Sequence, residues 1–488
     1  MRFALDTIKA ALDREGLLVG AKGELPESFE GISDDSRKVV PSSLFIAVRG
    51  SMRDGHDYLD RARELGAAAA MVEDPSRTNL PAIVVRHGRK AAAVAAGAAY
   101  GEPSRELRMI GITGTNGKST TAGILRHLLD HRGARAASIG TLGVLFGSDA
   151  EVVPGGADLT TPGPVELQRV LRELVNRGVK TVAMEVSSHS LDQQRIEGLA
   201  FDAAVFTNLT RDHLDYHHTM EAYFAAKAML MDYLKPDGSA VINIDDENWR
   251  ALPDSRKKIL FGLSALAEVR GTDVVFSPTG SEWNLNYHDA QAHINLPLIG
   301  DVNVHNALGA AAVGITFGLT LHEIANALAE LPQVPGRLEV ISQSPTVLRD
   351  YAHTPDAIER ALAAVRPFTA GRLILVFGCG GDRDRGKRAE MGKAAEQGAD
   401  LVIITNDNPR TEDPEQILDD IEQGMKPASH LRIVKRKAAI QRALEEARDG
   451  DVILLAGKGH ETYQIIGTTK LPFDEKLIVH ELLAGSAA

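Results

Sequence analysis

A glycine-rich turn stands between an apolar run and a helical pattern, and this arrangement constrains the fold more than any other part of the chain. Residues 107–113 (LRMIGIT) are apolar, GTNGKST follows, and a helix is predicted over 118–132. Glycines let backbone amides curl towards one point, where the start of a helix adds positive potential. The loop consists of Gly114, Thr115, Asn116, Gly117, Lys118, Ser119 and Thr120. A lysine charge and a Mg²⁺-binding serine hydroxyl complete a site for the phosphates of ATP.

The spacing of the glycines departs from the usual phosphate-loop motif. Five residues separate Gly111 from Gly117, one more than the pattern G-x-x-x-x-G-K-[ST] contains. A chance glycine-rich turn is the alternative. Strand, Gly-Lys-Ser and helix in the right order favour the nucleotide site.

Strands alternate with helices along the rest of this 488-residue chain, which is too long for one core. This alternation predicts mainly parallel sheets covered on both faces. Pro- and Gly-containing stretches at 101–104 and 331–336 indicate boundaries. We expect an α/β protein of three domains: a small N-terminal α/β domain (1–103), a central P-loop-type parallel-sheet domain (104–334) and a C-terminal Rossmann-like α/β domain (335–488).

The predicted elements can be stated by residue range. The strands are 44–48, 67–72, 82–85, 107–113, 181–186, 203–208, 238–243, 347–352, 372–379, 400–406 and 451–457, and helices are 89–100 and 118–132. Residues 264–298 alternate like antiparallel strands and suggest a small sheet appended to the central domain.

Composition excludes several classes of function. The net charge of −12 disfavours a nucleic-acid partner but leaves room for a local basic pocket that binds anionic small molecules. Cys379 is the single cysteine, so no intrachain disulfide forms, and a reducing compartment fits. The first residues lack the apolar core of a signal peptide, and no apolar run reaches ~18 residues, so we expect a cytoplasmic protein that is not embedded in a membrane.

Polar clusters follow two strands of the predicted central sheet. Glu185 ends the strand 181–186 and precedes Ser187, Ser188 and His189, and the run 208–215 (NLTRDHLD) follows the strand 203–208. Both should lie near the phosphate loop, where Glu185 and His213 are suitable ligands for a divalent ion. Taken singly, His189, His213, His217 and His218 are equally compatible with surface or helix-cap roles.

Lys227 stands in an apolar helix, EAYFAAKAML. Periodicity alone predicts that the aliphatic part of this side chain is buried and that its ammonium group reaches water.

Three clusters end strands of the C-terminal domain. They are 378–388 (GCGGDRDRGKR), 407–410 (DNPR) and 457–461 (GKGHE). Two fixed arginines, a glycine-lined opening and the Glu461 carboxylate together describe a pocket for a small zwitterion such as an amino acid, because arginine forks bind carboxylates and Glu461 suits an ammonium. Any one of these arginines alone is equally compatible with a solvated loop charge.

These motifs resemble those of the Mur ligase family over nearly the whole chain, and within it those of the members that add meso-diaminopimelate. The family pattern G-T-N-G-K-[ST] stands at 114–119 and accounts for the glycine spacing, and E-x-S-S-H and N-L-x-x-D-H-L-D stand at 185–189 and 208–215. The run from Ala222 to Leu230, which contains Lys227, resembles the family motif A-x-x-A-K-x-x-[LM]. The resemblance implies a CO₂-derived carbamate on Lys227 that helps to hold Mg²⁺, which replaces the interpretation from periodicity.

The resemblance also assigns roles to individual residues. It implies metal binding by Ser119, Glu185, His213 and carbamylated Lys227, catalysis by Lys118, Lys227, Glu185 and His213, and further nucleotide contacts by Asn306, Arg337 and Asp350. For the UDP-sugar dipeptide, bound with the help of the N-terminal domain, it implies Ser36, the loop 50–53, Thr160, Thr161, Ser187, Gln193 and Arg195. For meso-diaminopimelate it implies Arg383, Asp407, Asn408, Pro409, Arg410, Gly457 and Glu461.

The implied reaction is ATP-dependent amide formation in peptidoglycan precursor synthesis. The γ-carboxylate of D-Glu in UDP-MurNAc-L-Ala-D-Glu becomes an acyl phosphate, which the amine of meso-diaminopimelate attacks. Diaminopimelate is lysine with an extra carboxylate, and lysine would leave Arg410 and Arg383 unpaired at a cost of roughly 1–3 kcal/mol. A lysine-adding ligase, a folylpolyglutamate synthase and a P-loop switch or motor are the alternatives. We expect small-molecule partners only and a monomer.

Overall fold

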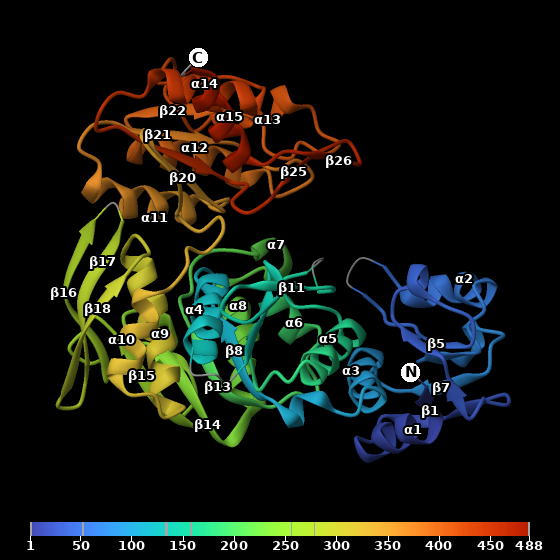
Figure 1. Ribbon diagram of the computed structural model, residues 1–488. Helices are drawn as coiled ribbons and strands as arrows, with labels where there is room; N and C mark the ends of the chain where they lie inside the picture. The colour runs from blue at the N-terminus through green and yellow to red at the C-terminus, as the bar shows by residue number, and fades with distance from the viewer. Residues whose placement is uncertain are drawn as a thin grey trace.

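The computed structural model describes residues 2–50, 53–131, 135–156, 159–254, 256–277 and 279–486. Three α/β domains follow one another along the chain, which confirms the predicted fold class (Figure 1). Ser51 and Met52 of the predicted sugar-binding loop, and Arg132 at the end of a predicted helix, lie outside the described residues. No helix in these ranges is both long enough and apolar enough to cross a membrane.

The N-terminal domain is built on a five-stranded sheet with strand order β2-β7-β6-β5-β4. One hydrophobic cluster packs α1 and α3 on one face, and a second packs α2 on the other. The three predicted strands are confirmed as β5, β6 and β7. The elements are β1 Phe3–Ala4, α1 Leu5–Arg14, β2 Leu18–Lys22, β3 Ser28–Phe29, β4 Gly31–Ser33, β5 Ser43–Ile46, α2 Leu59–Glu64, β6 Ala69–Val72, β7 Ala82–Val85 and α3 Gly88–Ala99.

The central domain contains an eleven-stranded sheet of order β11-β10-β9-β12-β8-β13-β14-β15-β16-β17-β18. Helices α4, α9 and α10 cover one face, and α5, α6 and α8 cover the other. The elements are β8 Arg108–Thr113, α4 Lys118–His131, β9 Ala136–Gly140, β10 Gly143–Phe146, β11 Glu151–Val153, α5 Pro164–Asn176, β12 Thr181–Glu185, α6 Ser188–Asp192, β13 Phe201–Phe206, α7 Leu214–His217, α8 Met220–Ala228, β14 Leu234–Asn243, β15 Lys257–Gly262, β16 Val269–Ser277, β17 Gly280–Tyr287, β18 Ala290–Leu296, α9 Asp301–Thr316 and α10 Leu321–Ala329.

The antiparallel strands predicted within 264–298 are present, but they do not form a separate sheet. Strand β16 pairs in parallel with β15 through Phe261↔Val269 and Gly262↔Arg270, and β17 and β18 then add antiparallel strands. The central sheet therefore continues without a break, because the end of β15 offers an unpaired edge to the next segment.

The C-terminal domain has a six-stranded sheet of order β19-β20-β24-β21-β22-β23, in which only β19 is antiparallel to its neighbour. Helices α11, α12 and α13 lie on one face and α14 and α15 on the other. The elements are β19 Glu339–Gln343, β20 Thr346–Asp350, α11 Pro355–Val365, β21 Leu373–Phe377, α12 Gly386–Gly398, β22 Leu401–Ile404, α13 Pro414–Glu422, β23 His430–Arg432, α14 Arg436–Glu446, β24 Val452–Ala456, β25 Tyr463–Ile466, β26 Thr469–Pro472 and α15 Glu475–Ser486.

Two buried groups characterise this domain. Arg436 and Glu475, both with 0% exposed side chains, form an ion pair of 2.8 Å, and Arg436 also donates to the carbonyl of Ala456 at 2.8 Å. Cys379 is buried, with its sulfur 3.5 Å from that of Met391, and burial raises the pKa of the thiol to about 12. The ion pair joins the starts of α14 and α15 to the end of β24.

Candidate active site

The phosphate loop leaves the centre of the central sheet, because β8 lies between β12 and β13. Gly114 (φ +146°) and Gly117 (φ +85°) have backbone conformations that side chains rarely adopt. A Cβ at Gly114 would overlap the hydroxyl of Thr207, and one at Gly117 would overlap the side-chain oxygen of Asn306. Both glycines are thus required by close packing as well as by conformation.

Two lysine side chains converge on one carbonyl oxygen of this loop. The Nζ of Lys118 donates to the oxygens of Gly114 and Thr115 at 2.9 and 2.7 Å, and the Nζ of Lys227 donates to that of Gly114 at 2.8 Å. Lys227 is 1% exposed and lies over the ring of Tyr223. Burial, with Lys118 close by, lowers the pKa of Lys227 well below its ordinary value. Lys227 therefore does not extend to water, contrary to the interpretation from periodicity.

Glu185 ends β12 as a buried carboxylate, 2% exposed. It accepts hydrogen bonds from the backbone amide of Thr141 at 2.9 Å and from the Thr141 hydroxyl at 3.2 Å. Within the described part of the chain it has no ion-pair partner at 4 Å or less. Glu185 and Lys118 nevertheless interact electrostatically: burial lowers the pKa of Lys118, and the carboxylate of Glu185 opposes this shift. The site thus contains a buried carboxyl group that no cation side chain of the described residues holds within 4 Å.

His213 precedes α7 in a left-handed conformation, with φ +53°. Its ring lies 4.7 Å from that of His189, and its Nε2 is 3.4 Å from a carboxylate oxygen of Asp212. Burial lowers the pKa of His213, although Asp212 opposes this shift. Burial and then the neighbouring His213 lower the pKa of His189 to about 4. Both rings are therefore neutral near pH 7 and have a nitrogen lone pair available for a ligand.

The predicted magnesium ligands fit that ion by their chemistry. No group of three or more His, Cys, Asp and Glu side chains in the described ranges is arranged as a complete metal site. Ser119, Glu185 and His213 offer a hydroxyl, an unpaired buried carboxylate and a neutral imidazole. Mg²⁺ generally takes one or two protein carboxylates and completes its shell with phosphate and water oxygens, so this incomplete set suits an ion that arrives with a nucleotide.

Five of the residues predicted for the sugar dipeptide form one connected group at the ends of β9 and β12. Thr160 accepts from the Thr141 hydroxyl, Thr161 donates to the backbone of Glu185 at 2.8 Å, and the amide of Ser187 donates to Thr161 at 3.1 Å. Arg195 donates to the carbonyl of Thr161 at 3.2 Å and to the side chain of Gln193 at 3.0 Å.

Ser36 lies in the N-terminal domain, opposite this group. A Cβ placed on Gly163 would be 3.2 Å from a carboxylate oxygen of Asp34, so the turn before Ser36 faces the segment that follows Thr161.

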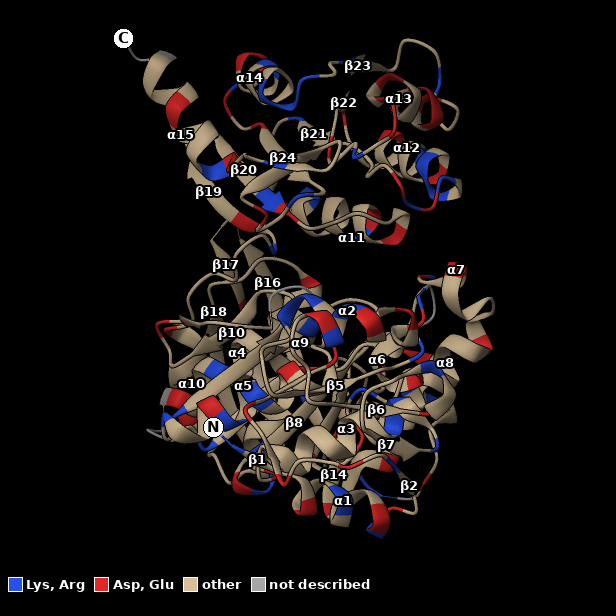
Figure 2. Cartoon of the chain, turned by 90° about the vertical axis from the view of Figure 1, so that its right-hand side faces the viewer, with Lys and Arg blue, Asp and Glu red and all other residues tan. Residues whose placement is uncertain are grey.

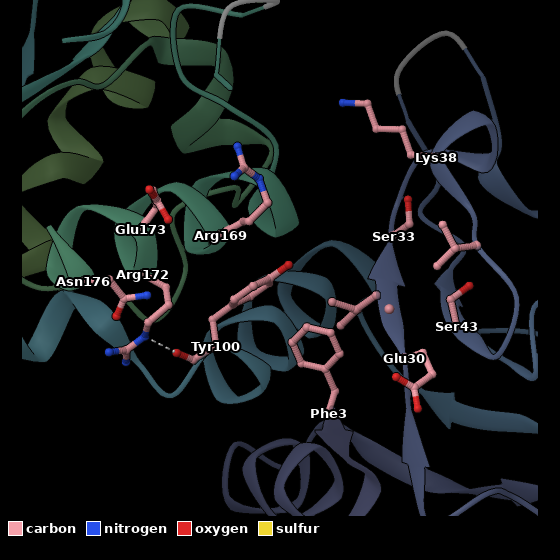
Figure 3. Close-up of a pocket in the computed structure, with 13 residues that line it drawn as sticks. Phe3, Glu30, Ser33, Lys38, Ser43, Tyr100, Arg169, Arg172, Glu173 and Asn176 are labelled. Carbon is pink, nitrogen blue, oxygen red and sulfur yellow. Dashed lines mark hydrogen bonds between the residues drawn. The ribbon is translucent and has the colours of Figure 1, made fainter. Parts of the chain in front are cut away.

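A pocket of about 340 Å³ lies between β4 of the N-terminal domain and α5 of the central domain (Figure 3). Its polar lining includes Ser33, Lys38 and Arg169, and Arg172 donates across its edge to the carbonyl of Tyr100 at 2.8 Å. None of the predicted site residues is among its lining residues. The pocket lies along the boundary between the N-terminal and central domains and is separate from the phosphate loop.

Two predicted nucleotide residues from the C-terminal half, Arg337 and Asn306, contact the phosphate loop. Arg337 donates to the Ser119 hydroxyl at 3.1 Å and stacks on Tyr351, with its guanidinium carbon 4.8 Å from the ring centroid. Asn306, next to Gly117, accepts from Thr121 at 3.3 Å. Asp350 ends β20 and accepts from the amide of Leu338 at 2.7 Å, and burial raises its pKa.

Arg410 is held in place by the β25–β26 hairpin. Its amide donates to the carbonyl of Ile465 at 3.1 Å, and its carbonyl accepts from Gly467 at 2.7 Å. Its guanidinium donates to the carbonyl of Gly381 at 2.7 Å. The residue has φ +52°, an uncommon conformation for a side chain of this size. These contacts make Arg410 one fixed arginine, as predicted.

Arg383 differs from that prediction. It is exposed, and in the described part of the chain no hydrogen bond or ion pair holds its side chain, so it is not a second fixed arginine. Gly380 is packed against the side chain of Arg410, since a Cβ there would be 3.0 Å from the guanidinium. The glycine run thus leaves room for the guanidinium of Arg410.

Asn408 and Glu461 are engaged with a residue for which the sequence suggested no role. The ammonium of Lys458, 0% exposed, lies 3.0 Å from Glu461 and 3.2 Å from the side-chain oxygen of Asn408. The Asn408 amide group donates to Glu461 at 2.9 Å. Asp407 is buried beside Gly457, where a Cβ would be 2.5 Å from its carboxylate. Pro409 continues this loop, and its carbonyl packs against Gly381.

Sequence reasoning missed three contributors to these sites. Thr141 follows β9 at the carboxyl edge of the sheet, and that position was a usable signal. Lys458 stood inside a recognised cluster, but only packing reveals its partners. The β25–β26 hairpin had no local signal that connects it with residues 407–410.

Three serial α/β domains, with a phosphate loop at the centre and polar strand ends facing it from the third domain, define a multidomain nucleotide-binding protein. Comparison with known families identifies this class more closely. Residues 28–107 match the model described as "Mur ligase family, catalytic domain", residues 112–314 match "Mur ligase middle domain", and residues 336–459 match "Mur ligase, glutamate ligase domain". The chain belongs to the Mur ligase family.

Individual relatives match over nearly the full length. A UDP-N-acetylmuramoyl-L-alanyl-D-glutamate–2,6-diaminopimelate ligase of Synechococcus elongatus is 45% identical, covering 91% of this chain and 92% of the relative. Ligase 1 of that name from Clostridium acetobutylicum is 41% identical, with coverages of 94% and 96%. A solved structure of a diaminopimelate ligase matches with a TM-score of 0.66 and 33% identity, covering 96% of this chain and 98% of that one.

Proposed function

We propose that this protein is an ATP-dependent, ADP-forming ligase that adds meso-diaminopimelate to the γ-carboxylate of D-Glu in UDP-MurNAc-L-Ala-D-Glu, a step of peptidoglycan precursor synthesis. Full-length identity of 41–45% to ligases of that name supports this reaction. The observation that carries the choice of amino acid is the anchored guanidinium of Arg410, since it can pair with the carboxylate that lysine lacks.

In the first step the substrate carboxylate oxygen attacks the γ-phosphorus of ATP, and the bond to the bridging oxygen of ADP breaks. Lys118 would turn from the loop carbonyls to the transferring phosphoryl group, and the loop amides would face the phosphates. Ser119, Glu185 and His213 would hold Mg²⁺, which neutralises charge between the two anions.

In the second step the neutral amine of the amino acid attacks the acyl carbon and an N–C bond forms. The C–O bond to the phosphate breaks, inorganic phosphate leaves, and the nitrogen releases one proton to solvent. The pocket around Arg410, Asp407 and Gly457 would orient the amino acid, with Arg383 at its open side. The Lys458 contact leaves one oxygen of Glu461 for the substrate ammonium. Exclusion of water matters here, because the acyl phosphate hydrolyses readily if water reaches it before the amine.

Lys227 is proposed to carry a carbamate. The neutral Nζ adds to the carbon of CO₂, an N–C bond forms, and one proton is released to solvent. The depressed pKa of Lys227 supports this step, because the neutral amine is the nucleophile. The product places an anionic oxygen ligand beside the loop and removes the repulsion between two lysines that share one acceptor.

Each of the three domains would then bind a different substrate or part of a substrate. Residues 1–103 would bind the uridine end with Ser36, residues 104–334 would bind ATP and the dipeptide, and residues 335–488 would bind the amino acid. We further propose that the protein acts as a cytoplasmic monomer on small molecules.

A phosphate-release assay tests the function. Turnover should require ATP, UDP-MurNAc-L-Ala-D-Glu and meso-diaminopimelate together, and L-lysine should replace the last one poorly. Nucleotide turnover that ignores the sugar peptide would instead favour a P-loop switch or motor.

A further inference from the structure

Asp356 lies at the start of α11. This helix lies on the side of the C-terminal domain that faces the central domain (Figures 1 and 2). One carboxylate oxygen of Asp356 accepts from the side-chain amide of Asn116 at 3.1 Å and from the hydroxyl of Thr210 at 3.0 Å. The other oxygen accepts from Arg360, one turn further along α11, at 3.0 Å. A single carboxylate of the C-terminal domain thus contacts two segments of the central domain.

One partner of Asp356, Asn116, belongs to the phosphate loop, and the other, Thr210, follows β13 and is bonded to that loop. The amide of Asn116 donates to the side chain of Asn208 at 2.9 Å, and the Asn116 carbonyl accepts from Thr207 at 2.7 Å. Thr210 is also bonded to the loop, since its amide donates to the Thr115 hydroxyl at 3.0 Å. Asp356 is therefore connected to the phosphate loop through both of its partners in the central domain.

Among the described residues, the other polar contacts between these domains do not replace this one. The amide of Val340 donates to the side chain of Gln333 at 2.8 Å, but these two residues flank the domain boundary itself. Arg337 bonds to Ser119, but both are proposed to turn to ATP and its metal. Arg211 and Glu390 are 3.6 Å apart with 72% and 52% exposed side chains, so water weakens their pairing. Asp356 and Arg360 are only 29% and 39% exposed, and the three bonds to the carboxylate are charge-assisted.

We propose that Asp356 is a positioning residue that holds the C-terminal domain against the phosphate loop, so that the amino-acid pocket stays over the acyl phosphate. The effect of this role on catalysis rests on the proposed ligase function, whereas the contact itself is independent of that function. Without the carboxylate, the domains would separate more often, and water would reach the acyl phosphate before the amine.

The test compares Asp356→Ala and Thr210→Val with Glu359→Ala, a control on the exposed face of the same helix. In Asp356→Ala the rate of amide formation should fall about tenfold, the effect expected when a charge-assisted hydrogen bond is lost. The ratio of phosphate released to amide formed should rise above one, and KM for the sugar peptide should stay within about twofold of that of the unchanged protein. Asp356→Asn, which keeps an acceptor oxygen, should recover part of the rate.

A double variant locates the effect in this contact. Asp356→Ala combined with Thr210→Val should be little worse than Asp356→Ala alone, because both remove the same bond. Small-angle X-ray scattering should give a larger radius of gyration for Asp356→Ala than for Glu359→Ala, and thermal unfolding should be alike in the two.

The proposal is overturned if Asp356→Ala equals Glu359→Ala in amide rate, product ratio and radius of gyration. Failure of the proposed function would look different: the unchanged protein would form no amide with meso-diaminopimelate, while scattering would still report whether Asp356 holds the domains together.

Discussion

Replacing Arg410 by alanine removes its guanidinium group. The backbone of this residue remains fixed by β25 and the turn after it. A guanidinium has five N–H donors in general, and one of those of Arg410 is used by Gly381, so the remainder can form a bidentate pair with a carboxylate. Two charge-assisted bonds of ~1.5–3 kcal/mol each would be lost, and partial exposure of the residue favours the low end of the sum, ~3 kcal/mol. This corresponds to roughly a 10²-fold loss in kcat/KM for meso-diaminopimelate.

The assay is phosphate release with meso-diaminopimelate and with L-lysine. Arg410→Ala should lose roughly 10²-fold with the former and change little with the latter, so the ratio between the two amino acids should collapse. Arg410→Lys keeps the charge without the fork and should remain defective.

Arg410→Gly separates the backbone from the side chain. Glycine adopts φ +52° without strain, so this variant should be as stable as Arg410→Ala or about 1 kcal/mol more so, and equally unselective. Arg442→Ala, on an exposed face of α14, is the control. Equal rises in KM for ATP and meso-diaminopimelate on loss of Arg410 would refute the reasoning.

Three other predictions concern the lysine, a buried pair and acid stability. Lys227→Ala should lose most activity and regain part of it with small carboxylates, and removal of CO₂ should lower the activity of the unchanged protein; a variant active unaided would contradict the carbamate. Glu475→Ala should lower the free energy of unfolding by ~3–5 kcal/mol in urea titrations, because Arg436 would be buried without its partner. The hydrogen bond from Arg388 lowers the pKa of Glu412 from 4.5 to about 2. Its folded pKa lies below the unfolded one, so this contribution is present above about pH 4.5 and lost as pH falls towards 2; Glu412→Gln should weaken that dependence in thermal scans.

Local features of the fold were predictable, and long-range contacts were not. The loop from Gly114 to Ser119 is defined by neighbours in sequence, so strand, turn and helix could be placed together. Lys227 lies more than a hundred residues from the carbonyl it contacts, and periodicity therefore gave it the wrong environment. Lys458, Thr141 and Asp356 each have at least one partner far along the chain, which only the packing of separate strands and domains brings near.

The first helix illustrates the same limit at short range. Its buried positions Leu5, Ile8, Ala11 and Leu12 follow a helical stripe, yet alternating charges obscured the pattern at the N-terminus. The continuation of the central sheet into β16 was similarly hidden, because only two register pairs connect it with β15.

The buried position of Cys379 has a practical consequence for experiments on domain movement. It is the single cysteine of the chain, and its raised pKa keeps little reactive thiolate near neutral pH. Maleimide dyes would therefore react with little background. A pair of introduced surface cysteines, one on α10 and one on α13, can carry a donor and an acceptor fluorophore, so that closing of the C-terminal domain during turnover is followed as energy transfer in single molecules.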